Sequence, residues 1–153
     1  MTAREYLRQI EILRIKIQQR RQQAAELREK ALSLGSPSLK ADPVQTSKSG
    51  SMVEKQVVQY LDMERRAEQL AVRMEKMRDK IIGEIQELDN PNYIEILYKK
   101  YVRLMTFKEI AKDTGKNHDW LRHLIRKAEW AFEKKYQISE KTAQKSTRSA
   151  DII

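Results

Sequence analysis

The side chains with the greatest chemical capacity lie between Thr106 and Ala128, in the stretch TFKEIAKDTGKNHDWLRHLIRKA. Both histidines of the chain are here, together with a tryptophan, two aspartates and several basic residues. His118 and His123 are five positions apart, so on a helix they point about 140° apart and cannot chelate one metal ion together. The pattern therefore favours hydrogen bonding and charge contacts over metal binding.

Catalysis is not indicated by the rest of the sequence. It contains no recognisable Ser-His-Asp set, phosphate-binding glycine loop or metal cluster, and carboxylate pairs such as Glu84 and Glu87 stand in highly charged sequence. The lack of cysteine excludes disulfides and thiolate metal sites. We expect a protein that is not an enzyme and that needs no cofactor, metal ion or small-molecule substrate.

Two short helices joined by a tight turn are expected to position the chemical side chains. Thr106 and Glu109 have the spacing of a capping box at the start of the first helix. Gly115 suits the left-handed conformation that ends a helix, because it has no Cβ. Asn117 is then a favourable N-cap for the second helix.

The second helix is expected to have one nonpolar and one polar face. The 3.6-residue period places nonpolar residues from Leu121 to Ala128 on one side and charged or hydrogen-bonding residues on the other. A polar face of this composition suits base edges and phosphates in the major groove of DNA. Trp120 fits two roles equally well, stacking on DNA or packing against a neighbouring helix. The predicted DNA-contacting residues are Thr106, Lys116, Asn117, His118, Asp119, Trp120, Arg122, His123, Arg126 and Lys127.

This stretch resembles region 4 of bacterial sigma factors and the phage regulators built on the same unit. The shared pattern runs Glu109-Ile110-Ala111, Gly115 and Asn117, then HDWLRHL from His118. The chain length and the long N-terminal coil also resemble phage late-gene activators of the autolysin-regulator type in Gram-positive hosts. The resemblance implies that five residues contact DNA, namely His118, Asp119, Trp120, Arg122 and His123.

The chain departs from the sigma pattern in two respects. His118 and Trp120 stand where sigma factors usually carry basic residues, and the other sigma regions are missing. Recognition of an ordinary promoter element and a role as a complete initiation factor are therefore not expected.

A third helix is expected to precede the pair, beginning at Asn90-Pro91 or at Asn92, since proline is tolerated at the first helical position. The three helices run from about Asn90 to Tyr136. Residues 91–136 contain eleven Lys and Arg against six Asp and Glu, a net charge of +5. This concentration of positive charge suits phosphate contacts, and the basic residues of the first helix could add more. The expected nonpolar face of the third helix comprises Tyr93, Ile94, Leu97, Tyr98, Tyr101 and Leu104.

Two heptad patterns occupy the first two thirds of the chain, each typical of a long helix with one buried stripe. The first runs from Ala3 to Leu34 and is nonpolar except at Arg20, which either fixes the register or reaches water at the edge. The second runs from Val53 to Leu88, so each helix would be about 50 Å long. Residues 35–51 between them are rich in serine, with two prolines and two glycines, as in a flexible linker.

Several arrangements would bury these stripes: an antiparallel hairpin within one chain, a coiled coil between two chains, or a four-helix bundle of two hairpins. We expect an all-α protein in which a long antiparallel helical hairpin (a coiled coil) precedes a three-helix helix-turn-helix domain. The expected domains are 1–89, with the linker 35–51, and 90–136, followed by a disordered tail at 137–153. No long nonpolar run is present, so we expect no membrane span or signal peptide and a cytoplasmic location in a bacterial host.

The function expected from these features is that of a sequence-specific DNA-binding transcription regulator, an activator, of phage or mobile-element origin. The helix from Asn117 would read double-stranded DNA, and the hairpin would form a homodimer or contact RNA polymerase. Two alternatives remain open. A small terminase subunit also joins such a turn unit to a long helical segment, and a protein that binds polymerase or a host factor would not touch DNA.

Overall fold

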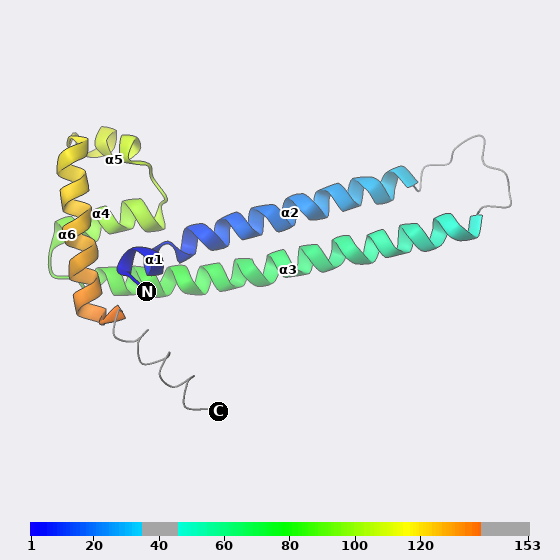
Figure 1. Ribbon diagram of the computed structural model, residues 1–153, viewed down its shortest axis with the longest axis horizontal. Helices are drawn as coiled ribbons and strands as arrows, with labels where there is room; N and C mark the ends of the chain where they lie inside the picture. The colour runs from blue at the N-terminus through cyan, green and yellow to red at the C-terminus, as the bar shows by residue number, and fades with distance from the viewer. Residues whose placement is uncertain (35–45, 139–153) are drawn as a thin grey trace, which may run out of the picture. The chain divides into compact units, whose positions relative to one another are not determined.

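The computed structural model describes residues 1–34 and 46–138, and every regular element in these ranges is a helix. The expected all-α class is confirmed for this part of the chain. The elements are α1 (Ala3–Leu7), α2 (Gln9–Leu34), α3 (Thr46–Gln86), α4 (Pro91–Leu97), the π-helical turn η2 (Tyr98–Val102), α5 (Phe107–Thr114) and α6 (His118–Tyr136), as Figure 1 shows. None of the described helices combines the length and hydrophobicity that a membrane span requires.

The chain divides into two compact units whose boundaries fall inside the long helices. Unit 1 comprises Met1–Ile12 and the chain from Glu75 onward, and unit 2 comprises Leu13–Met74. The start of the chain and the end of α3 therefore belong with α4, α5 and α6, whereas the sequence pattern places them in a hairpin domain ending at residue 89. The reason is packing, because nonpolar residues at both ends of the predicted hairpin are buried in the core of unit 1.

The N-terminal helix is interrupted near its start, where the sequence pattern predicts one helix from Ala3. Thr2 and Glu5 form a capping box on α1, and Arg8 ends this helix with ψ −5°. Backbone hydrogen bonds nevertheless continue across the interruption, from Arg8 N to Arg4 O (3.0 Å) and from Ile12 N to Arg8 O (3.1 Å). Leu7 is fully buried here, a position that the predicted stripe omits.

Unit 2 contains most of α2 and α3, which lie side by side and run in opposite directions (Figure 1). Arg20 lies in the predicted stripe, and its guanidinium donates to Met63 Sδ and Gln23 Oε1, both at 3.5 Å. It forms no ion pair with any described residue, so it satisfies its donors at the edge of the stripe as long basic side chains do. The buried nonpolar residues of unit 2 are Leu13, Ile17, Ala24, Ala31 and Ala67, all of them predicted stripe positions.

The predicted linker is shorter than the sequence pattern indicates, because α3 begins at Thr46 rather than after Ser51. Proline disrupts the interior of a helix, and the sequence of α3 from Thr46 to Gln86 contains none. Gly50 costs only about 1 kcal/mol in a helix interior, which a long helix can tolerate at its first turns. Residues 35–45 and the side chain of Leu34 lie outside the described part of the protein.

The core of unit 1 forms around α6, which packs on α1, α4 and α5. Burying a large nonpolar side chain stabilises the fold by roughly 1.5–3 kcal/mol relative to exposure, so this cluster dominates the packing energy. Helix α6 ends at Tyr136, as predicted, although Ile138 is also buried and so the predicted tail does not begin at residue 137. Residues 139–153 lie outside the described part. The largest fully buried side chains are Leu7, Ile81, Ile85, Leu97, Ile110, Leu121 and Phe132.

The helix before Thr106 has the predicted start but a different buried face. Asn90 Oδ1 accepts from Asn92 N at 2.9 Å, so Asn90 is the N-cap and Pro91 the first helical residue. From Tyr98 the chain forms a π-helical turn with a bond from Arg103 N to Tyr98 O at 3.0 Å. This wider turn shifts the helical phase, so a face predicted from the α period is wrong in part. The buried residues are Ile96, Leu97, Tyr101 and Val102.

Candidate nucleic-acid interface

The start of α5 is held by a reciprocal capping box. Thr106 Oγ1 accepts from Glu109 N at 3.2 Å, and Glu109 Oε2 accepts from Thr106 N at 2.7 Å. The backbone N–H of Thr106 lowers the pKa of Glu109 by stabilising its carboxylate. The predicted capping box is therefore confirmed, and the Thr106 hydroxyl is used as a hydrogen-bond acceptor in it.

The connection between α5 and α6 also forms as predicted. Gly115 has a left-handed conformation with φ +69°, and its N–H donates to Ala111 O at 2.9 Å. Asn117 is the N-cap of α6, and its Oδ1 accepts from Trp120 N at 2.7 Å. Three residues therefore connect the two helices, which are in direct contact.

Helix α6 has the predicted division into a buried and an exposed face. Leu121 and Ala128 are 0% exposed and Ile125 is 2% exposed, which anchors the helix on the core. Leu124 is half-buried at the edge of this face. The predicted contact residues are all exposed. Thr106 lies at the start of α5, Lys116 and Asn117 lie on the turn before α6, and the others lie on α6: His118, Asp119, Trp120, Arg122, His123, Arg126 and Lys127.

The exposed residues of α6 make only weak contacts with one another. Arg122 NH1 lies 3.9 Å from Asp119 Oδ1, and both side chains are largely exposed, so the ion pair adds little stability. The Lys116 ammonium lies 5.2 Å from the centre of the Trp120 ring, a cation–π contact at the surface. Trp120 remains 41% exposed, so its ring is accessible to a ligand.

Trp130 differs from the other aromatic residues at the end of α6. For Trp130, Phe132 and Tyr136 the sequence pattern favours contacts with the core or the hairpin over a stacking surface, and Phe132 is indeed fully buried. Trp130 is 65% exposed, because two positions along a helix turn a side chain by about 200°. The core prediction is therefore wrong for Trp130, whose ring instead lies 5.0 Å from the Lys134 ammonium.

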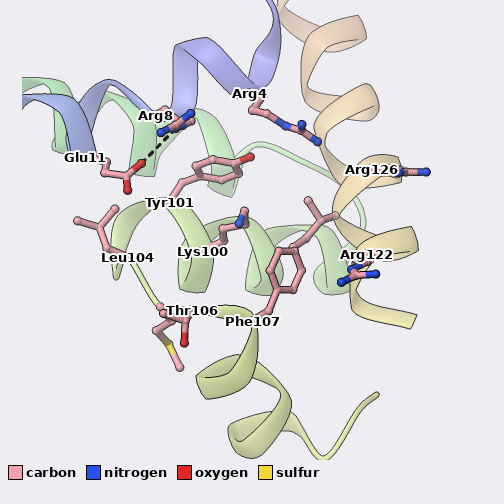
Figure 2. Close-up of a pocket in the computed structure, with 12 residues that line it drawn as sticks. Arg4, Arg8, Glu11, Lys100, Tyr101, Leu104, Thr106, Phe107, Arg122 and Arg126 are labelled. Atoms are coloured by element: carbon pink, nitrogen blue, oxygen red, sulfur yellow. Dashed lines mark hydrogen bonds and ion pairs between the residues drawn. The ribbon is translucent and has the colours of Figure 1, made fainter. Parts of the chain in front are cut away.

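An open basic groove of about 560 Å³ lies beside the exposed face of α6 (Figure 2). Lys100 comes from η2, and Arg122 and Arg126 come from α6. Glu11 is the one acidic residue that lines the groove. The basic groove is defined by its five cationic residues, Arg4, Arg8, Lys100, Arg122 and Arg126.

Lys100 lies at the centre of the basic groove, between Tyr101 and Phe107 in Figure 2. Its ammonium is 4.3 Å from the centre of the Phe107 ring and 5.7 Å from that of Tyr101. It forms no ion pair with any described residue, and burial lowers its pKa. Sequence reasoning did not select Lys100, because the π-helical turn that orients it has no clear local signature.

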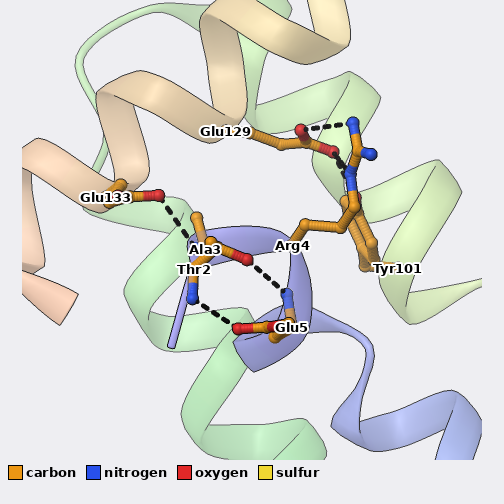
Figure 3. Close-up of polar contacts among 7 residues, drawn as sticks. All are labelled: Thr2, Ala3, Arg4, Glu5, Tyr101, Glu129 and Glu133. Carbon is orange, nitrogen blue, oxygen red and sulfur yellow. Dashed lines mark hydrogen bonds and ion pairs between the residues drawn. The ribbon is translucent and has the colours of Figure 1, made fainter. Parts of the chain in front are cut away.

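A polar cluster joins the start of the chain to α6 beside the groove, and two of its residues, Arg4 and Tyr101, line the groove (Figure 3). Glu129 is buried, and its Oε2 accepts from Arg4 NH2 at 3.2 Å. Its Oε1 accepts from the Tyr101 hydroxyl. Ala3 N donates to Glu133 Oε2 at 3.0 Å on the next turn of α6. Because Arg4 is tied to Glu129, the first helix is held against α6 at the groove.

A second ion-pair cluster fixes α5. Lys99 Nζ lies 2.6 Å from both Glu95 Oε1 and Asp113 Oδ2. The hydrogen bond from Lys99 lowers the pKa of Asp113, and Asp113 and Glu95 raise the pKa of Lys99. The end of α5 is thereby linked to η2. The two neighbouring lysines therefore have separate roles, because Lys99 forms these ion pairs and Lys100 lines the groove.

Comparisons with protein-family models, curated proteins and solved structures found no match to this chain. The resemblance to sigma region 4 therefore stays a prediction from the sequence pattern. Within the described ranges, no group of His, Asp and Glu side chains is arranged to hold a metal ion. The basic groove and the exposed face of α6 are the two surfaces that offer several charged and hydrogen-bonding side chains to a ligand.

Proposed function

We propose that this protein is a sequence-specific DNA-binding transcription regulator, an activator, of phage or mobile-element origin. In this proposal α4, α5 and α6 form a helix-turn-helix unit, and α6 enters the major groove of double-stranded DNA. The observation that carries the proposal is the exposed face of α6, where the residues from His118 to Lys127 present charged and hydrogen-bonding groups on a helix anchored by a nonpolar face.

The dimensions and chemistry of α6 support this role. An α-helix with its side chains is about 10–12 Å across, and the major groove is about 12 Å wide. Arg122 would pair with the O6 and N7 atoms of guanine, and Asp119 would accept from the amino group of cytosine. Arg126 and Lys127, farther along the helix, would contact phosphates, which position the protein without reading sequence.

The pair of long helices would supply the interaction with a second chain or with RNA polymerase. Unit 2 leaves large nonpolar side chains exposed on both helices, including Ile15 at 47%, Leu32 at 67% and Val58 at 66%. Side chains of this kind favour association, because burying them removes nonpolar surface from water. We propose a coiled-coil hairpin that forms a homodimer or contacts polymerase.

The proposal is tested first by selecting duplexes from a random library with the purified protein. Affinity for the selected duplex is then measured for the wild type, Arg122→Ala and His123→Ala. Loss of a bidentate base contact in Arg122→Ala should cost about 1–3 kcal/mol on the selected duplex. Arg73→Ala is the matched control, because Arg73 is exposed on α3 in unit 2.

Two results would overturn the proposal. If no duplex is enriched, or if both variants keep wild-type affinity and salt dependence, α6 is not a reading helix and a protein partner becomes the better explanation. A map of DNA occupancy in the host then separates the remaining functions. Sharp peaks upstream of a gene block indicate a regulator, whereas a peak inside a packaging gene with a large ring of chains in light scattering indicates a terminase subunit.

A further inference from the structure

We propose that the basic groove binds the sugar-phosphate backbone of one DNA strand while α6 lies in the adjacent major groove. This inference rests on the proposed function and extends it from the reading helix to a composite phosphate site. Its cations come from three parts of the sequence: the first twelve residues, η2 and α6.

Continuity with α6 determines which ligand suits the groove. Arg122 and Arg126 belong to the exposed face of α6 and also line the groove. A duplex whose major groove receives α6 must bring a phosphate strand along the side of that helix. The groove is partly open to solvent, so an extended polyanion can reach its cations.

Lys100 is the side chain whose surroundings point most directly to an anion. Its ammonium is half-buried against two aromatic rings and forms no direct ion pair with a described residue, although the Glu129 and Glu11 carboxylates act on its charge at longer range. The rings and these carboxylates offset part of the cost of burying the cation, and a phosphate oxygen at this point would add a direct partner. Arg126, on α6, also has no ion-pair partner in the described part of the chain and is exposed.

Arg4 and Arg8, at the start of the chain, differ in how freely they can contact a phosphate. Arg8 Nε lies 3.1 Å from Glu11 Oε2, but both side chains are about half exposed, so this surface pair can be exchanged for a phosphate at little cost. Arg4 is held by the buried Glu129 carboxylate and positions the wall. We therefore assign phosphate contacts to Arg8, Lys100, Arg122 and Arg126, and a positioning role to Arg4.

The experiment measures binding of two 30-base-pair duplexes, the selected one and one of random sequence, over a series of KCl concentrations. Each phosphate contact that is lost reduces the slope of log K against log salt by about 1. Lys100→Gln and Arg8→Gln should each reduce the slope by this amount and weaken both duplexes by the same factor. Lys100→Arg should restore binding, because it returns the charge to the same position.

Controls separate a local contact from a change in total charge or in folding. Lys55→Gln and Arg73→Gln remove the same charges from exposed positions in unit 2 and should leave the slope unchanged. Thermal unfolding checks each variant. If Lys100→Gln is unfolded, Arg8→Gln decides the question alone, because the Arg8 side chain is 54% exposed and its loss leaves no cavity.

The outcomes distinguish this inference from the proposed function. If the wild type discriminates between the duplexes but Lys100→Gln and Arg8→Gln keep wild-type affinity and slope, the groove is not a phosphate site and the regulator proposal stands. If the wild type binds neither duplex, both proposals fall. If inorganic tripolyphosphate raises the unfolding temperature of the wild type but not of Lys100→Gln, while DNA affinity is the same for both, the groove serves a small polyphosphate instead.

Discussion

Arg4 and Glu129 form an ion pair across 125 positions of the chain, with Arg4 NH2 lying 3.2 Å from Glu129 Oε2. The same carboxylate accepts a hydrogen bond from the Tyr101 hydroxyl, so one buried acid connects the first helix, η2 and α6. The hydrogen bond and charge of Glu129 raise the pKa of Arg4. The wall of the basic groove thus depends on a carboxylate that does not itself line the groove.

Replacement of Glu129 by alanine should destabilise the protein by about 1–3 kcal/mol, because the buried Tyr101 hydroxyl loses its acceptor and Arg4 its partner. The free energy of unfolding in urea measures this effect. Glu64→Ala is the control, since Glu64 is exposed on α3 and should change stability by no more than about 0.5 kcal/mol. Equal stabilities of the two variants would contradict the structural role of Glu129.

Gly115→Ala should destabilise the protein by about 1–2 kcal/mol, because a Cβ is strained in the left-handed conformation. No heavy atom lies within 4 Å of the position that this Cβ would take, so the effect is one of backbone conformation alone. Gly83→Ala is the control, and it should change the free energy of unfolding in the opposite direction. Gly83 lies inside α3 with equally free space, so alanine there should stabilise the helix by about 0.4–1 kcal/mol. Urea unfolding of both variants checks the pair, and a shift of the same sign in both would refute the assignment.

Thr106→Ala should cost about 1 kcal/mol by removing the N-cap of α5, whereas Thr106→Ser should be nearly neutral because serine caps equally well. The pKa of Glu109 in the same box is lowered in the folded state. Its contribution is therefore present above its ordinary pKa of 4.5 and is lost as the pH falls through the folded value. Urea unfolding at pH 7 and in a series down to pH 3 should show the difference between Thr106→Ala and wild type shrinking in acid.

Stability should also decrease in alkali above about pH 10. Burial, the first cause, and the hydrogen bond to Glu129 raise the pKa of Tyr101, and burial with the bond to Glu84 raises that of Tyr6. A group whose folded pKa lies above the unfolded value of 10.0 stabilises the fold fully below pH 10, and this contribution is lost as the pH rises toward the folded pKa.

Urea unfolding between pH 8 and pH 11 measures this loss for the wild type and for Tyr101→Phe. The variant should be less stable at pH 8, because Glu129 loses a donor, but its stability should fall less steeply in alkali. Lys99, whose pKa is also raised, contributes to the loss in both proteins and does not affect their difference. Parallel pH profiles would show that Tyr101 is not the group responsible.

The sequence by itself determined the features that depend on neighbours within about four residues. The caps at Thr106, Gly115 and Asn117 could be predicted, because each uses a local backbone bond that the residue type specifies. The sequence leaves the start of the preceding helix open between Asn90-Pro91 and Asn92, and the structure has the N-cap at Asn90. The division of α6 into a buried and an exposed face could also be predicted, because the helical period alone separates Leu121 from Arg122.

Only the tertiary structure decided what lies beside that face. The basic groove combines Arg8, Lys100 and Arg126, which are far apart in the chain and meet because α1 packs on α6. Tyr101 is buried in the π-helical turn next to Lys100, and its hydroxyl donates to the buried Glu129 on α6. A local sequence pattern does not predict such contacts, because their free energy comes from surfaces that form only when the helices pack together.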